Sequence, residues 1–573
     1  MRLQLSLSFF SRFWLPLWII TVALLPTLAM AQATKPQTTK VDDKELARQI
    51  DTMLAATFQP DAPGGAVLVL RDGKPILRKG YGLANLELHV PVTPEMVFRL
   101  GSLTKQFTAV AILMLVEEGK VKLSDDITRY WPDYPTDGQK ITVEQLLTHT
   151  SGIKNYTDLP EWFNLWRQDM TPDELIALFK DKPLDFTPGT RWAYSNSGYI
   201  LLGALIEKVT GMSYEAFIQQ RIFTPLGMAH AAYDQTERIL PGRVSGYSRG
   251  EDGYLNAQYL SMSQPYAAGS LAASVDDLAK WDAALYTDKL VKQRTLQSAF
   301  KSFTLKDGGD TGYGYGFSVA DYEGHTLLQH SGGINGFATY MLRLPDDKVY
   351  VALLTNCDNC PVPLVDLAFN IATLVIGKPY RDPAVINLPT STLASYIGVY
   401  QFDEQTDLVI RQEGDQLVAQ YPGIPPQPIL PSAPTEFFIK DAMIRLRFVK
   451  DAAGKVSAVQ VQEHFGPWRM ARKSDKPLPA ARQPIEIDPA LYEQYIGEYQ
   501  IAPSFSLTIA VNEGKLLVKP TGQDVAQLFP ETETLFFLAV VDAQIEFVKD
   551  AAGKVTGLIL HQGGQDMSGK KIK

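Results

Sequence analysis

Residues 98–109 read FRLGSLTKQFTA and run into the apolar stretch 110–116, VAILMLV. The segment 101–119 predicts a buried helix, because glycine bounds it at both ends and it contains no proline. Ser102 falls in the first turn and Lys105 three residues later, so the two side chains share one face of the helix. A desolvated lysine gives up its proton readily and can then activate a neighbouring serine hydroxyl, while the free N–H groups at the helix start can stabilise an anion. The stretch therefore predicts a serine nucleophile with a lysine base.

The serine–lysine spacing alone is weak support, because Ser-x-x-Lys also occurs at 151–154 and 568–571. An ordinary surface pair is the alternative at any such match. Context favours Ser102, since a strand-like segment and a glycine precede it and a long apolar helix follows. We therefore predict that Ser102 is the catalytic serine.

Length and composition are those of a multi-domain globular protein. A chain of 573 residues, 45% hydrophobic and 20% charged, is expected to form two or three domains. Its formal net charge is −9, and its Lys and Arg residues form no run. An acidic chain without a basic patch offers no electrostatic attraction to nucleic acid, so we expect no nucleic-acid partner.

The N-terminus has the pattern of a secretory signal. Arg2 and Arg12 precede an apolar run over 13–25, and Ala29-Met30-Ala31 supplies small residues for a cleavage site. We predict that residues 1–31 are a signal peptide and that the mature protein is exported, to the periplasm or the medium, with no membrane span. An uncleaved membrane anchor is the alternative, because the apolar stretch approaches the length of a span.

The chain has two cysteines, Cys357 and Cys360, in the sequence Cys-Asp-Asn-Cys. A zinc site needs more ligands than these, and the seven histidines are scattered along the chain. In an exported protein the pair predicts either a small loop disulfide or two unpaired thiols. The sequence implies no metal and no organic cofactor.

Residues 43–377 predict an α+β domain in which helices flank an antiparallel sheet. Two strand-like runs enclose the turn Asp72-Gly73, a helix-rich middle follows, and further strand-like runs come after it. The expected helices are 45–57, 101–119, 200–209, 214–222 and 275–285, and the expected strands are 65–70, 75–81, 314–319, 325–329, 337–344 and 349–354.

Further polar side chains of this domain are candidates for the same site. Tyr194 and Asn196 lie in the loop before the helix at 200–209, which would place a phenol and an amide together. His330 ends a strand-like segment, and the small residues that follow it leave room for a substrate backbone to lie alongside. The predicted site comprises Ser102, Lys105, Tyr194, Asn196, His330, Ser331, Gly332 and Gly333.

Two other candidate features are left out of the predicted site. His149, near the end of a helix-like segment, is a candidate base, but a histidine satisfied by backbone groups is the favoured interpretation. The run 246–250, Gly-Tyr-Ser-Arg-Gly, matches the nucleophile elbow of α/β-hydrolases, which must join a buried strand to a helix. Polar residues follow this run and no apolar segment leads into it, so we reject it.

A proline-bearing linker, 378–389, is followed by two related β-rich segments. The sequence FVKDAAGKV at 448–456 recurs identically at 547–555, and Tyr-Ile-Gly at 396–398 recurs 99 residues later at 495–497. The two copies are therefore collinear. We predict two small antiparallel barrels, at 388–475 and 487–573, with Asp-Ala-Ala-Gly-Lys as a hairpin turn in each. They would serve either as spacers or as gates that limit substrate length.

Three motifs in chain order, Ser102-Leu103-Thr104-Lys105, Tyr194-Ser195-Asn196 and His330-Ser331-Gly332, resemble those of the class C β-lactamase-like, penicillin-recognising serine hydrolases. Segments 146–152 and 188–199 are typical of the same family, and the resemblance covers residues 45–375. The layout of a catalytic domain with two barrels resembles the D-stereospecific aminopeptidases of that family. The C-terminal units are similar to lipocalin-like barrels.

The resemblance implies a role for each matched residue. Ser102 is the acylated nucleophile, and Lys105 takes or tunes its proton. Tyr194 acts as general base or acid at the leaving group, and Asn196 orients Lys105 and the substrate amide. The N–H groups of Ser102 and Gly333 form the oxyanion hole.

The third motif departs from the family pattern, because class C lactamases carry Lys-Thr-Gly where this chain has His330-Ser331-Gly332. A fixed cation suits a substrate carboxylate, whereas a histidine with an ordinary pKa is only partly charged at neutral pH. This departure favours substrates without an essential C-terminal carboxylate, such as aminopeptidase or ester substrates. From the three motifs and the repeat architecture we expect a small-molecule or short-peptide substrate, with cleavage of amide bonds in D-amino-acid-containing peptides. The alternatives are a carboxylesterase, a β-lactamase or D,D-carboxypeptidase, and a non-catalytic protein that binds cell-wall fragments.

Overall fold

The computed structural model describes residues 42–573 apart from 251–252, 403–405, 422–425, 480–483, 503–504, 522, 524, 540 and 563–564. The predicted signal peptide, 1–31, lies outside the described residues. Within them, no helix combines the length and the apolar character needed to cross a membrane.

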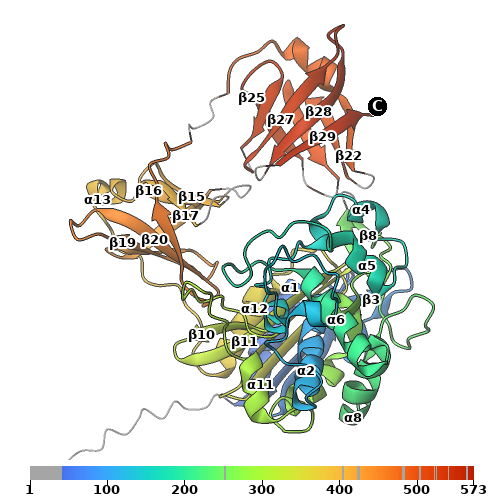
Figure 1. Cartoon of the computed structure of the whole chain (residues 1–573). Coiled ribbons are helices and arrows are strands. Elements are labelled where there is room, and N and C mark those ends of the chain that lie inside the picture. Colours follow the sequence, from blue (N-terminus) through green and yellow to red (C-terminus); the bar gives the residue numbers. More distant parts are fainter. Residues whose placement is uncertain are drawn as a thin grey trace, which may run out of the picture. The chain divides into compact units, whose positions relative to one another are not determined.

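The N-terminal part of the chain forms an α+β domain around a six-stranded antiparallel sheet, as the sequence predicts (Figure 1). Strand β1 (Gly65–Arg71) lies inside the sheet, where Val67 is opposite Leu353 on one side and Lys79 on the other. The sheet order is β10 (Ser318–Tyr322), β11 (His325–Ile334), β12 (Phe337–Leu344), β13 (Val349–Thr355), β1 (Gly65–Arg71) and β2 (Lys74–Tyr81).

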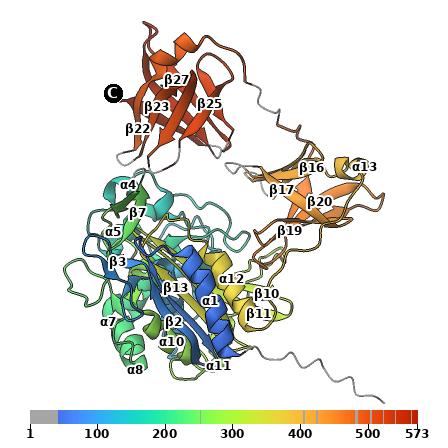
Figure 2. The ribbon, with the colours of Figure 1, turned by 180° about the vertical axis from the view of Figure 1, so that it is seen from behind.

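Helices cover both faces of this sheet. On one face α1 (Asp43–Thr57) and α12 (Leu364–Val375) lie against the sheet (Figure 2). Their buried apolar side chains belong to one core cluster with those of the strands. On the other face lies the core built around α2 (Thr104–Glu117) and α6 (Asn196–Thr210). Strand β13 is buried along its whole length because both of its faces are covered, which explains its continuous apolar sequence.

Helix α2 is the centre of the domain core. A short 3-10 turn, Gly101–Leu103, leads into it, and every residue from Thr104 to Leu115 is buried. The remaining helices of the domain are α3 (Val143–Leu147), α4 (Trp162–Leu165), α5 (Pro172–Phe179), α7 (Tyr214–Ile218), α8 (Thr224–Leu226), α9 (Tyr266–Gly269), α10 (Val275–Ala284) and α11 (Gln293–Ala299).

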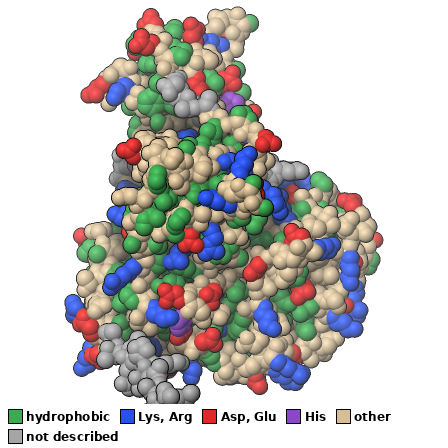
Figure 3. Space-filling view, turned by 90° about the vertical axis from the view of Figure 1, so that its left-hand side faces the viewer, with side chains coloured by type: hydrophobic (Ala, Val, Ile, Leu, Met, Phe, Trp, Pro, Cys, Tyr) green, Lys and Arg blue, Asp and Glu red, His purple; other side chains and the backbone are tan. Residues whose placement is uncertain are grey.

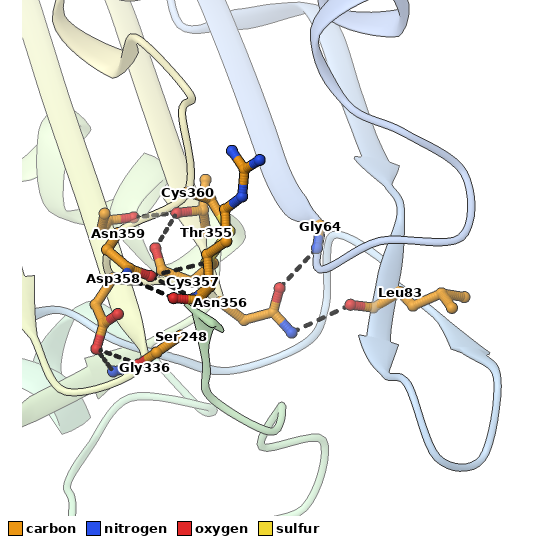
Figure 4. Close-up of a disulfide and its surroundings, with 12 residues drawn as sticks. Gly64, Leu83, Ser248, Gly336, Thr355, Asn356, Cys357, Asp358, Asn359 and Cys360 are labelled. Atoms are coloured by element: carbon orange, nitrogen blue, oxygen red, sulfur yellow. Dashed lines mark hydrogen bonds between the residues drawn. A yellow bond between two sulfur atoms is a disulfide. The ribbon is translucent and has the colours of Figure 1, made fainter. Parts of the chain in front are cut away.

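The loop after β13 contains a disulfide between Cys357 and Cys360, which decides between the two alternatives left by the sequence (Figure 4). The Asp358 carboxylate within this loop accepts hydrogen bonds from the Gly336 N–H at 2.7 Å and the Ser248 hydroxyl at 3.0 Å. Ser248 lies in the hairpin of β7 (Tyr247–Gly250) and β8 (Gly253–Asn256), not at the strand-to-helix turn that a nucleophile elbow requires.

The C-terminal part of the chain forms two closed eight-stranded barrels, each with consecutive strands paired antiparallel. The first runs through β14 (Gly398–Gln401), β15 (Asp407–Glu413), β16 (Gln416–Gln420), β17 (Gln427–Ala433), β18 (Glu436–Ile439), β19 (Ile444–Lys450), β20 (Val456–Glu463) and β21 (Arg469–Lys473). The second runs through β22 (Gly497–Ala502), β23 (Phe505–Asn512), β24 (Lys515–Pro520), β25 (Ala526–Pro530), β26 (Leu535–Leu538), β27 (Ala543–Lys549), β28 (Val555–Gln562) and β29 (Gln565–Lys571).

The sequence repeat has the same structural role in each barrel. In the first, the Tyr396 ring stacks on Phe448 at 4.3 Å, and the Tyr400 hydroxyl donates to the Tyr396 carbonyl at 2.6 Å. In the second, Tyr495 stacks on Phe547 at 4.2 Å.

Basic and acidic side chains are interspersed over the face of the molecule in Figure 3.

Candidate active site

The segment that carries Ser102 is held by two pieces of backbone. Strand β5 (Phe98–Arg99) pairs with β9 (Leu271–Ala273), which directly follows α9. On the other side, the backbone of Gly101 lies against β11, where an added Cβ atom would come within 3.0 Å of the Gly333 nitrogen. Gly101 also has a φ of +55°, so glycine is required here for both space and conformation. These contacts place Ser102 between α9 and the end of β11.

Lys105 is fully buried directly beneath Ser102. Its Nζ atom lies 3.1 Å from the Ser102 Oγ, 2.9 Å from the Asn196 Oδ1 and 2.9 Å from the Ala268 carbonyl oxygen. Desolvation lowers the pKa of Lys105 well below its ordinary value. A neutral amine has two N–H groups, which match the two obligate acceptors, and one lone pair, which is left for the serine hydroxyl. The three contacts therefore suit Lys105 as the base that deprotonates Ser102.

Asn196 is fixed by contacts on both sides of its amide. Its Oδ1 accepts from Lys105, its Nδ2 donates to the Thr157 hydroxyl at 3.2 Å, and its backbone N–H donates to the Asn155 side chain at 2.9 Å. The predicted contact with Lys105 is therefore present. Helix α6 begins at Asn196, so this residue lies in the first helical turn and not in the loop where the sequence placed it.

Tyr194 stands over the serine–lysine pair. The Lys105 Nζ lies 4.8 Å from the centre of the Tyr194 ring. The Tyr194 hydroxyl is buried and has no hydrogen-bond partner within ordinary distance among the described residues. Burial raises the pKa of Tyr194, and interaction with the Ser102 hydroxyl lowers it by a smaller amount. The phenol is therefore protonated at neutral pH and suits proton donation to a leaving group.

His330 is buried, with 5% of its surface exposed, and both ring nitrogens are engaged. Nδ1 lies 2.6 Å from the Ser331 carbonyl oxygen, and Nε2 lies 2.8 Å from the hydroxyl of Tyr313. A carbonyl only accepts, so Nδ1 carries the proton and Nε2 accepts from the tyrosine. Burial, with a smaller effect of Lys105, lowers the pKa of His330 to about 4. The ring is neutral at neutral pH and presents no cation to a substrate carboxylate.

The end of β11 provides the open side of the site. Ser331 and Gly333 are exposed, and an added Cβ atom at Gly333 would meet no atom of the described residues within 4 Å. Gly332 is buried instead, and a Cβ atom there would lie 2.1 Å from the Leu100 carbonyl oxygen. Alternate residues of the strand therefore face solvent and contact the segment that precedes Ser102.

Two contributors to this site were not predicted. The Ala268 carbonyl belongs to the backbone of α9, so no side-chain pattern could reveal it. Tyr313 lies in the alternating sequence Gly-Tyr-Gly-Tyr-Gly at 312–316, and that alternation was an available signal. The other candidate, His149, lies beside Tyr194 with ring centres 4.4 Å apart and makes no hydrogen bond with Ser102 among the contacts of the described residues.

A serine hydroxyl 3.1 Å from a buried lysine amine, at the start of a helix packed between a sheet and further helices and with a protonated tyrosine beside the amine, is the arrangement of a serine hydrolase. The Beta-lactamase family model matches residues 45–375, and the chain belongs to that family. A second family model, a domain of unknown function (DUF3471), matches 382–475 and 481–571.

Individual relatives agree with this assignment. The chain is 27% identical over 436 residues to a penicillin-binding protein of Bacillus subtilis strain 168, covering 71% of this chain and 95% of the relative. It is 27% identical over 339 residues to a D-aminopeptidase of Gluconobacter oxydans, covering 58% of this chain and 63% of the relative. The solved structure of an octameric penicillin-binding protein homologue from Pyrococcus abyssi is 27% identical, has a TM-score of 0.52, and covers 75% of this chain and 100% of its own.

Proposed function

We propose that this serine hydrolase is exported and cleaves amide bonds of small, D-amino-acid-containing peptides through an acyl-enzyme on Ser102. The observation that carries the proposal is the contact between the buried Lys105 Nζ and the Ser102 Oγ, at 3.1 Å. The similarity to a D-aminopeptidase supports the amide substrate class. The N-terminal sequence supports export.

Acylation involves Lys105, the two N–H groups of the oxyanion hole and Tyr194, in that order. The Lys105 lone pair takes the Ser102 hydroxyl proton as Oγ bonds to the substrate carbonyl carbon, whose oxygen becomes an anion. The N–H groups of Ser102 and Gly333 stabilise that oxyanion. When the tetrahedral intermediate collapses, the C–N bond breaks and the Tyr194 hydroxyl proton goes to the leaving nitrogen. The Lys105 ammonium then returns a proton to the Tyr194 oxygen.

In deacylation, water is the nucleophile and Lys105 again accepts the proton. Lys105 takes a proton from the water as the water oxygen bonds to the acyl carbon. The acyl–Oγ bond then breaks, and Ser102 regains its proton from the lysine. Asn196 holds the amine in line throughout, because its Oδ1 lies 2.9 Å from Nζ.

The neutral His330 supports substrates without an essential carboxylate. A β-lactamase or D,D-carboxypeptidase that relied on a cation at this position would lack it at neutral pH, because the pKa of His330 is about 4. We propose that His330 contributes by fixing Tyr313 through the 2.8 Å hydrogen bond, while Ser331, Gly332 and Gly333 form the edge along which the substrate lies.

The test compares kcat/KM for D-alanyl-p-nitroanilide, its L-isomer and the matching p-nitrophenyl ester, with Ser102→Ala as control. We expect preference for the D-anilide and complete loss of turnover in the variant. Turnover of the ester alone, lost in Ser102→Ala, would replace the amide substrate class by a carboxylesterase activity. Turnover that survives in Ser102→Ala would overturn the proposal.

A further inference from the structure

His149 holds the backbone on both sides of Tyr194. Its carbonyl oxygen accepts the N–H of Ala193 at 3.0 Å, and its Nδ1 atom accepts the N–H of Ser195 at 3.1 Å. Its ring lies 4.4 Å from the Tyr194 ring, between centres. One residue therefore makes a contact before, at and after the tyrosine.

The backbone of His149 adopts a left-handed conformation. Its φ is +58°, in a region that few residues other than glycine occupy, although histidine enters it more often than most. His149 is 1% exposed, and its Nε2 atom is buried with no hydrogen-bond partner in the part of the chain that the structure describes. Such strain persists only where the surrounding contacts determine it, and here those contacts include the hydrogen bonds with Ala193 and Ser195 on either side of Tyr194.

The same contacts exclude His149 as the base that activates Ser102. Nδ1 accepts from the Ser195 N–H, so the ring proton of the neutral imidazole is on Nε2. The ring then has no free lone pair to receive a proton. Burial, the Lys105 amine and His330 lower the pKa of His149 well below its ordinary value, and the other titratable groups against its ring are Tyr194, Tyr199 and Tyr313. These surroundings keep the ring neutral and the acceptor available.

We propose that His149 is a positioning residue for Tyr194, which it holds over the Ser102–Lys105 pair so that the phenol proton reaches the leaving group. The proposal rests on the proposed acyl-enzyme function. Loss of this positioning should affect the anilide and the nitrophenyl ester to different extents. An anilide nitrogen must gain a proton as it leaves, whereas nitrophenolate departs without one. Loss of the positioning contact should therefore impair anilide cleavage and spare the nitrophenyl ester.

The matched variants are His149→Leu and His149→Asn, which are close to each other in shape. Asparagine keeps an acceptor for the Ser195 N–H and tolerates the left-handed backbone, whereas leucine offers no acceptor. We expect His149→Leu to lower kcat/KM for the D-anilide by about 10- to 100-fold and for the ester by less than about threefold. His149→Asn should retain most of the anilide activity. Adding His149→Leu to Tyr194→Phe should cause little further loss, because both act on one proton transfer.

Two results would overturn the proposal: equal loss on both substrates in a folded His149→Leu enzyme, or equal anilide loss in the Asn and Leu variants. Circular dichroism and thermal unfolding establish folding. If the leucine variant does not fold, His149→Gly replaces it, since glycine removes the side chain and relieves the positive φ. If the wild-type enzyme cleaves only esters, the amide substrate class fails separately, and the same comparison is made between the nitrophenyl and ethyl esters, because an alkoxide also needs a proton to leave.

Discussion

Replacing Asn196 by aspartate tests whether Lys105 must be neutral. The change is nearly isosteric and places a carboxylate 2.9 Å from the Lys105 Nζ. At an effective dielectric constant of ~20, a charge pair at that distance is worth about 5–6 kcal/mol, or about four pKa units on the lysine. The cost of burying the new carboxylate offsets part of this energy. Asn196→Asp therefore raises the pKa of Lys105 and keeps the base protonated to higher pH.

The assay is the pH dependence of kcat/KM for the best substrate. In the wild-type enzyme, burial lowers the pKa of Lys105, so activity should fall only as acid protonates the amine. In Asn196→Asp the acidic limb should move to higher pH, so that kcat/KM at neutral pH falls and recovers about tenfold for each pH unit up to the new pKa. Asn196→Leu is the neutral control and should lose activity without that upward shift. An unshifted acidic limb in a folded Asn196→Asp enzyme would refute the role of neutral Lys105.

Three further predictions concern the support of the site. Tyr313→Phe leaves the buried Nε2 of His330 without its 2.8 Å donor and should lower the free energy of unfolding by about 1–3 kcal/mol in urea titrations; no change would contradict that contact. Gly316 has a φ of +74°, and a Cβ atom there would lie 2.8 Å from the Lys105 carbonyl oxygen, so Gly316→Ala should lower both Tm and kcat. The control is Gly308→Ala, because Gly308 also has a positive φ but a Cβ atom there would meet no atom of the described residues within 4 Å. This variant should lower only Tm. Replacing both cysteines of the Cys357–Cys360 disulfide by serine should lower stability by about 2 kcal/mol, because the closed loop is short, and unchanged urea midpoints would refute this.

The local features of the site were predictable because they depend on residues close in sequence. Ser102 and Lys105 lie on one helical face, and the apolar run after them forms the buried helix α2. The antiparallel sheet, its flanking helices and the two barrels were predicted as a fold class from alternation, turns and the internal repeat. Periodicity and turn residues are local signals, so they were sufficient here.

The remaining features depend on residues distant in sequence. The Ala268 carbonyl reaches Lys105 from 163 positions away, through the pairing of β5 with β9. The strand expected at 314–319 begins at Ser318 instead. Gly316 lies against the Lys105 backbone in α2 and Gly314 against the Ala299 carbonyl at the end of α11, so neither glycine joins the sheet. The neutrality of His330 follows from burial against Tyr313, and burial of a polar residue is a property of the folded chain. A single sequence contains no direct signal for these distant backbone contacts or for the burial of His330.

The central claim is that Ser102 carries the acyl group during turnover. The most direct measurement is mass spectrometry of enzyme quenched during hydrolysis of a D-alanyl p-nitrophenyl ester, followed by peptide mapping. The account predicts one D-alanyl adduct, on the peptide that contains Ser102, and none in Ser102→Ala. Turnover without an adduct on that peptide, under conditions where deacylation is rate-limiting, or an adduct that persists in Ser102→Ala, would contradict it.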